Sequence, residues 1–133
     1  LDTVVKHGGN QSSSITVNSV PAVDYFAEAA QRVVAVPGRT ATLTGWVNTQ
    51  AFSNVSVTSA SVGIAAYDAN GNVLAVQSQS LQGQNNWTLR TVALLVPATA
   101  TELKLFYNLY GSVAGNIQVG EKARYDDFNL IQQ

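Results

Sequence analysis

Residues 62–79 read VGIAAYDANGNVLAVQSQ, two short, mainly apolar runs on either side of the dipeptide Asn70-Gly71. Asn followed by Gly tolerates the positive φ angles of a tight hairpin turn, so this dipeptide marks a reversal of the chain. The segment therefore predicts two neighbouring antiparallel strands, one from Val62 to Asp68 and one from Val73 to Gln79.

The same two-residue periodicity continues on both sides of this hairpin. Apolar residues alternate at Leu43 and Val47 upstream, and at Leu103, Leu105 and Leu109 downstream, which is the pattern of half-buried strands. We expect strands at residues 12–18, 31–36, 40–48, 55–67, 73–80, 88–96, 101–110 and 123–131. Eight strands joined by brief turns predict an all-β fold, a two-sheet antiparallel jelly-roll β-sandwich.

One segment, Asp24 to Ala30, has a different pattern. Asp24 is a good helix cap and the segment is rich in Ala, but seven residues are marginal for a helix. We expect either a single helical turn or an ordered loop.

The composition limits the possible partners. The 133-residue chain fits a single domain spanning residues 1–133. Only 11% of its residues are charged and its formal net charge is −1, so nucleic acid is not expected as a partner. No apolar stretch approaches the roughly 18 residues of a membrane span, so membrane insertion is not expected. Cysteine is absent, which excludes disulfides and cysteine-bound zinc.

Several short motifs follow one another along the chain: His7–Ser12, Gln31–Val33, Val36–Val47, Asn86–Thr88, Val92–Pro97, Thr101–Leu105 and Tyr125–Leu130. Their order resembles the carbohydrate-binding modules of families 4, 9 and 22, which have a galactose-binding-like jelly-roll fold. The resemblance implies a non-catalytic module that binds a polysaccharide or oligosaccharide and tethers a larger secreted, cell-surface or virion-surface protein to it.

The chain departs from the family at its beginning. Modules of this type usually open with a strand that carries an Asn-x-x-Phe-Glu pattern, and this sequence starts after that point. We expect that strand to be missing, and the sheet edge it leaves to be covered by a partner or a second copy of the chain.

Trp46 is the first candidate for a ligand contact. Alternation puts Trp46 and Asn48 on the face of their strand opposite Leu43 and Val47. The resemblance implies that an aromatic residue on this strand forms part of a concave sugar platform, where neighbouring amides meet the sugar hydroxyls. Alternatively, Trp46 caps the edge of the core.

A second candidate row lies on the strand at residues 101–110. There Phe106, Asn108 and Tyr110 share the face away from the core, and such an aromatic–amide–aromatic row suits sugar recognition. We expect Trp46, Asn48, Asn108 and Tyr110 to lie together on the concave sheet. The alternative is that Phe106 and Tyr110 pack under a loop or against another subunit.

Arg90 is a further candidate ligand contact. On the polar face of a strand, its guanidinium group would fit the carboxylate of an acidic sugar, and the alternative is a solvated side chain. Trp87 matches the framework tryptophan of the family, which packs rather than binds.

Asp126 is the candidate metal ligand. We expect Asp126 and Asp127 to point to opposite faces, which prevents them from acting as the acid and base of a glycosidase. An inward Asp126 then needs a cation or several donors. The resemblance implies a structural Ca²⁺, and the alternative is a hydrogen-bonded carboxylate without metal.

The sequence offers no catalytic motif. His7 is the only histidine, expected in an exposed loop, and the chain has no Gly-x-Ser-x-Gly nucleophile turn. We therefore expect no catalytic residue. Two alternatives stay open: a structural or oligomerisation domain of a phage tail or surface fibre, and a lyase or hydrolase on a jelly roll, for which no residue spacing argues.

Overall fold

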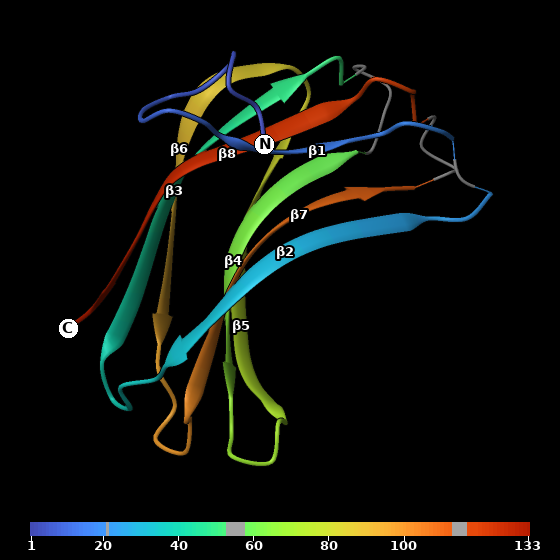
Figure 1. Ribbon diagram of the computed structural model, residues 1–133. Coiled ribbons are helices and arrows are strands. Elements are labelled where there is room, and N and C mark those ends of the chain that lie inside the picture. Colours follow the sequence, from blue (N-terminus) through green and yellow to red (C-terminus); the bar gives the residue numbers. More distant parts are fainter. Residues whose placement is uncertain (21, 53–57, 113–116) are drawn as a thin grey trace.

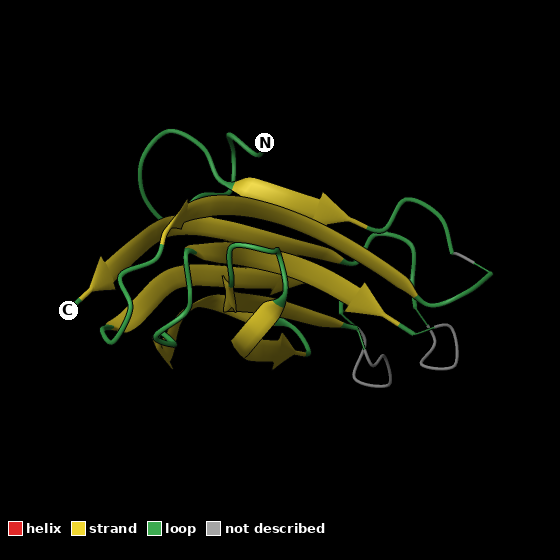
Figure 2. Ribbon diagram, turned by 90° about the horizontal axis from the view of Figure 1, so that it is seen from below, coloured by secondary structure: helices red, strands yellow, loops and turns green. Residues whose placement is uncertain are grey.

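The computed structural model describes the whole chain except residues 21, 53–57 and 113–116 (Figure 1). The described part contains eight strands: β1 (Ser13–Thr16), β2 (Tyr25–Val34), β3 (Thr40–Gln50), β4 (Ser59–Tyr67), β5 (Val73–Gln82), β6 (Asn85–Leu95), β7 (Glu102–Gly111) and β8 (Lys122–Gln132). Strands and loops make up all of this part, as Figure 2 shows, and none of it is a helix that could cross a membrane.

The strands form two four-stranded antiparallel sheets packed face to face, with strand orders β1-β8-β3-β6 and β2-β7-β4-β5. The predicted fold class, an all-β jelly-roll sandwich, is confirmed. Figure 1 shows both sheets bending in the same sense, with β2-β7-β4-β5 on the inside of the bend. We call this the concave sheet and β1-β8-β3-β6 the convex sheet.

The core lies between the two sheets, where the alternating apolar residues meet. Leu43 and Val47 from β3 face Ile64 from β4 and Leu103 and Leu109 from β7, and each is at most 1% exposed. Each such burial stabilises the folded state by about 1.5–3 kcal/mol. The outward side chains of the same strands are not part of the core and are therefore available for contacts with a ligand or a partner.

The predicted hairpin is confirmed, since β4 pairs antiparallel with β5. In the turn, Gly71 has a φ of 82° and its N–H donates to the carbonyl oxygen of Asp68. The Asp68 carboxylate accepts hydrogen bonds from the backbone N–H groups of Asn70 and Asn72. Gly71, and not Asn70, supplies the positive φ.

The expectation for Asp24 to Ala30 is wrong. These residues enter β2, which pairs with β7 along its full length, from Tyr25 opposite Gly111 to Val34 opposite Glu102. A seven-residue segment gains little as an isolated helical turn. A continuous ladder with β7 satisfies the backbone groups on that side of β2 instead, so tertiary pairing overrides the local preference.

The edge formed by β1 is short. β1 pairs with β8 only from Ser13 opposite Tyr125 to Thr16 opposite Lys122. In the described chain, residues 1–6 add a single bridge, between Asp2 and Ser12, and do not run along β1. Covering of this edge by a partner stays a prediction.

Candidate functional site

The outward face of β7 lies in the middle of the concave sheet, between β2 and β4. As predicted, Phe106, Asn108 and Tyr110 point away from the core, while Leu103 and Leu109 point into it. Figure 1 shows the sheet curving toward this side, so its central residues lie on the inside of the curve, which we call the floor of the hollow face.

Asn108 occupies the centre of that floor. In the register of the sheet, Asn108 lies between Glu28 of β2 and Ser61 of β4, and Ser61 is opposite Ser80 of β5. Only 7% of Asn108 is exposed, and within the described residues its carboxamide has no hydrogen bond. Its polar atoms are not among the fully buried, unpartnered ones of the described chain, so the amide keeps some contact with solvent. Such a group is available to a ligand that brings both a donor and an acceptor.

Small side chains keep the floor beside Asn108 low. The hydroxyl oxygens of Ser61 and Ser80 lie 2.9 Å apart in a hydrogen bond. The next residue on this face of β4 is Gly63, and the ring of Phe106 lies directly against it: a Cβ on Gly63 would be 2.2 Å from Cζ of Phe106. Phe106 is 9% exposed. It therefore forms part of the floor and does not project as a stacking platform.

Two aromatic residues stand at one end of the face. Tyr110 is 38% exposed and lies opposite Phe26 of β2, which is 58% exposed. The Tyr110 hydroxyl donates to Oδ2 of Asp24 at 3.2 Å, and the Ser112 hydroxyl donates to Oδ1 of the same carboxylate at 2.9 Å. These bonds hold the Tyr110 ring beside the hollow.

Charged side chains on this face are paired. Lys104 Nζ lies 2.6 Å from Oε1 of Glu28, and Arg32 pairs with Glu102. The Arg32 guanidinium also lies 4.9 Å from the ring centre of Tyr67. Surface pairs of this kind contribute little stability, but the charges of these four residues balance one another.

Sequence reasoning missed Phe26 and Glu28 because it did not place residues 25–30 in a strand. Once β2 is paired with β7, its alternation puts both residues on the concave face. The same register adds Ser61 and Ser80, whose small side chains gave no signal of their own in the sequence.

Trp46 and Asn48 do not lie on this face, so the prediction of one shared surface is wrong. They sit on the outward face of β3, in the convex sheet. There the ring of His7 stacks on Trp46 with centroids 3.9 Å apart and meets Trp87 edge-on at 5.8 Å. Alternation shows which side chains share a face of one strand, but not which sheet that strand joins.

Arg90 also belongs to the convex sheet, on β6 opposite Gly45. Its Nε atom is buried and has no hydrogen-bond partner among the described residues. The structure therefore separates Arg90 from Asn108 and Tyr110, and Arg90 is not the fully solvated side chain of the alternative reading.

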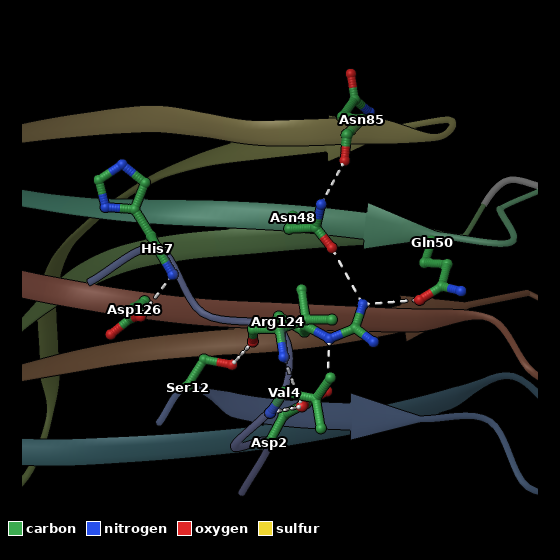
Figure 3. Close-up of polar contacts among 10 residues, drawn as sticks. Asp2, Val4, His7, Ser12, Asn48, Gln50, Asn85, Arg124 and Asp126 are labelled. Atoms are coloured by element: carbon green, nitrogen blue, oxygen red, sulfur yellow. Dashed lines mark hydrogen bonds and ion pairs between the residues drawn. The ribbon is translucent and has the colours of Figure 1, made fainter. Parts of the chain in front are cut away.

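The two adjacent carboxylates, Asp126 and Asp127, do not point to opposite faces as expected. Oδ2 of Asp126 accepts hydrogen bonds from the backbone N–H groups of His7 (3.0 Å) and Gly8 (3.2 Å), and Oδ2 of Asp127 lies 2.8 Å from Nδ1 of His7 (Figure 3 shows the first of these bonds). The cause is an irregularity in β8, where Asp127 has a φ of 51° and the register with β3 shifts. Both carboxylates therefore anchor residues 7–8 to the convex sheet.

Calcium at Asp126 stays a prediction, but its surroundings do not fit that ion. Calcium needs several oxygen ligands, whereas the contacts of this carboxylate are N–H donors, including the backbone N–H of Asp127 to Oδ1 at 2.9 Å. In the described part of the chain, no group of three His, Asp or Glu side chains is placed to hold a metal.

The chain is similar to several solved structures. It shares 24% identity and a TM-score of 0.66 with the enzymatically active domain of tailspike protein 4 from bacteriophage CBA120, covering 98% of this chain but 17% of that one. A family 61 carbohydrate-binding module, solved in complex with β-1,4-galactotriose, gives 16% identity and a TM-score of 0.63, covering 96% of this chain and 74% of that one. A family 16 carbohydrate-binding module gives 17% identity and 0.62, covering 98% and 82%.

No protein-family model and no curated protein matches the chain. The identities to these three structures are below 25%, and they show the fold alone: the chain has the two-sheet sandwich of these modules, and it spans a small part of the tailspike domain.

Proposed function

We propose that the protein binds carbohydrate non-catalytically on the concave face, with Asn108 as the central polar contact. The observation that carries this proposal is the carboxamide of Asn108, which is nearly buried, faces the hollow and has no hydrogen bond within the described chain. A pair of neighbouring sugar hydroxyls would supply both of the partners that this amide lacks.

The other residues of the face suit an uncharged, hydroxyl-rich ligand. Ser61 and Ser80 add hydroxyl groups beside Asn108, and Tyr110 and Phe26 offer aromatic surface for the apolar side of a sugar ring. The charges of Lys104 and Glu28 balance each other in an ion pair. The likeness of the fold to carbohydrate-binding modules supports the same class of ligand.

The protein would act by holding a larger extracellular protein to a polysaccharide. The chain is similar in fold to one part of a phage tailspike, 17% of that structure, and this likeness supports a virion-surface setting. The phage alternative, a domain that serves assembly, differs in one respect: it would bury Tyr110 and Phe26 against another copy instead of leaving them for a ligand.

A glycan array first identifies candidate sugars. Isothermal titration calorimetry with these sugars, and with β-1,4-galactotriose, xylotriose and cellotriose, then tests the proposal. Binding should be lost in Asn108→Ala and weakened in Tyr110→Ala, while Asn129→Ala, an exposed change on the convex sheet, should bind normally. Sedimentation should show a monomer. A tight oligomer that protects Tyr110, without binding to any glycan, would favour the assembly role instead.

A further inference from the structure

A polar pocket opens on the convex sheet, on the other side of the molecule from the concave face. Its volume is about 290 Å³, and its lining comes from β3, β6, β8, residue 84 and the N-terminal segment. The residues that matter most are Asn48, Gln50, Gln84, Asn86 and Arg124. Figure 3 shows Arg124 of β8 joined by dashed lines to Asn48 and Gln50 of the neighbouring β3.

Arg124 organises the base of this pocket. It is 5% exposed, and its Nη1 donates to Oδ1 of Asn48 at 3.1 Å and to Oε1 of Gln50 at 2.9 Å. Asn48 in turn donates to the backbone oxygen of Asn85 at 3.0 Å. The oxygen of each amide is thus held by Arg124, so the position of its NH₂ group is set before any ligand arrives.

The charge of Arg124 is already balanced. Its Nε lies 2.7 Å from Oδ2 of Asp2, a carboxylate that is itself held by the backbone N–H groups of Val4 and Val5. Among the described residues that line the pocket, Arg124 is the only charged one. Because Asp2 already neutralises the charge of Arg124 from outside that lining, the pocket has little net attraction for an anionic ligand.

Donors and acceptors remain open at the rim. Within the described chain, the side chains of Gln84 and Asn86 have no hydrogen bond, and neither has Nε2 of Gln50. Each free carboxamide can donate to one hydroxyl and accept from its neighbour. Ligand pockets span roughly 300–1,000 Å³, so this volume is at their lower limit. A pocket of this size suits a single sugar ring better than an oligosaccharide.

We propose that this pocket is a second binding site, for a single neutral sugar unit such as a chain end or a side branch. The amides of Asn48, Gln50, Gln84 and Asn86 would bind its hydroxyls, with Arg124 as the positioning residue for the first two. The site is separate from the concave face and does not depend on the function proposed for that face.

Side-chain amide signals in ¹H–¹⁵N NMR spectra test this directly, with galactose, glucose, xylose and arabinose as probes and galacturonate as the acidic counterpart. At least one neutral sugar should shift the pocket amides in a saturable way. In Gln84→Ala/Asn86→Ala, two exposed changes near a turn, the Kd should rise by at least about tenfold, or about 1.4 kcal/mol.

Asn108→Ala and Asn129→Ala should leave this binding unchanged, so that failure of the concave site and failure of the pocket give different results. The proposal is overturned if none of the neutral sugars shifts the pocket amides, or if the double variant binds as tightly as the unaltered protein. Tighter binding of galacturonate than of every neutral sugar would also overturn it.

Discussion

The imidazole of His7 lies almost parallel to the indole of Trp46, with ring centroids 3.9 Å apart and an angle of 16° between the planes. This contact and the bonds to Asp126 and Asp127 fasten the N-terminal segment across the convex sheet. A tryptophan that was a candidate sugar platform is thus covered by the protein's own chain.

Replacing His7 should uncover that tryptophan. In His7→Ala we expect the loss of the ring contact to lower the free energy of unfolding by about 0.5–1.5 kcal/mol, and the emission of Trp46 to shift to longer wavelength. Trp46→Phe in the same background identifies the signal. An unchanged spectrum and stability would mean that the stack does not form in solution.

Gly63 should tolerate no side chain. In Gly63→Ala the new Cβ would meet the ring of Phe106 at 2.2 Å, and overpacking of this kind costs about 1–3 kcal/mol. Urea unfolding measures the loss. Adding Phe106→Ala should make the effect of Gly63→Ala much smaller, and strictly additive effects would contradict the contact.

Asn108→Ala should separate binding from stability. Since the carboxamide has no partner in the described chain, its removal should change the free energy of unfolding by less than about 1 kcal/mol, while sugar binding is lost. Thermal unfolding of the free protein gives the first quantity. A large destabilisation would show that the amide serves the fold.

Acid should weaken the protein partly through Asp2. Hydrogen bonds from the backbone of Val5, then the Arg124 side chain and the backbone of Val4, hold the pKa of Asp2 well below its ordinary value of 3.8. A folded-state pKa below the unfolded value stabilises the protein above pH 3.8, and this contribution is lost as the pH falls further.

Asp2→Asn should therefore flatten the dependence of stability on pH in the acidic range, as followed by thermal unfolding at a series of pH values. The pKa of Asp68 is also lowered, chiefly by hydrogen bonds from Asn72. Asp68→Asn is therefore the matched comparison, and it should remove a different part of the dependence of stability on pH. If Asp2→Asn kept the full acid dependence, the contacts of Asp2 in solution would differ from those described.

The sequence predicted what is local in this fold. Alternation along single strands correctly separated Leu103 and Leu109 from Asn108 and Tyr110, and Asn70-Gly71 marked the hairpin. These features depend on neighbouring residues alone, so one sequence is enough to see them.

The sequence-based predictions were wrong where the structure depends on pairing between segments that are far apart in the chain. Residues 25–30 become a strand because β7 pairs with them, and Trp46 joins the convex sheet because β3 pairs with β8 and β6. The positive φ of Asp127 turns two adjacent carboxylates to one side. Each of these outcomes depends on a partner strand that the local pattern does not name.

Because the hollow face and the amide-lined pocket lie on the outer faces of the two packed sheets, they open in opposite directions. A protein with both sites would join two glycan strands instead of coating one. Mixed with a branched polysaccharide, it should raise the viscosity of the solution and, at higher concentration, form a gel.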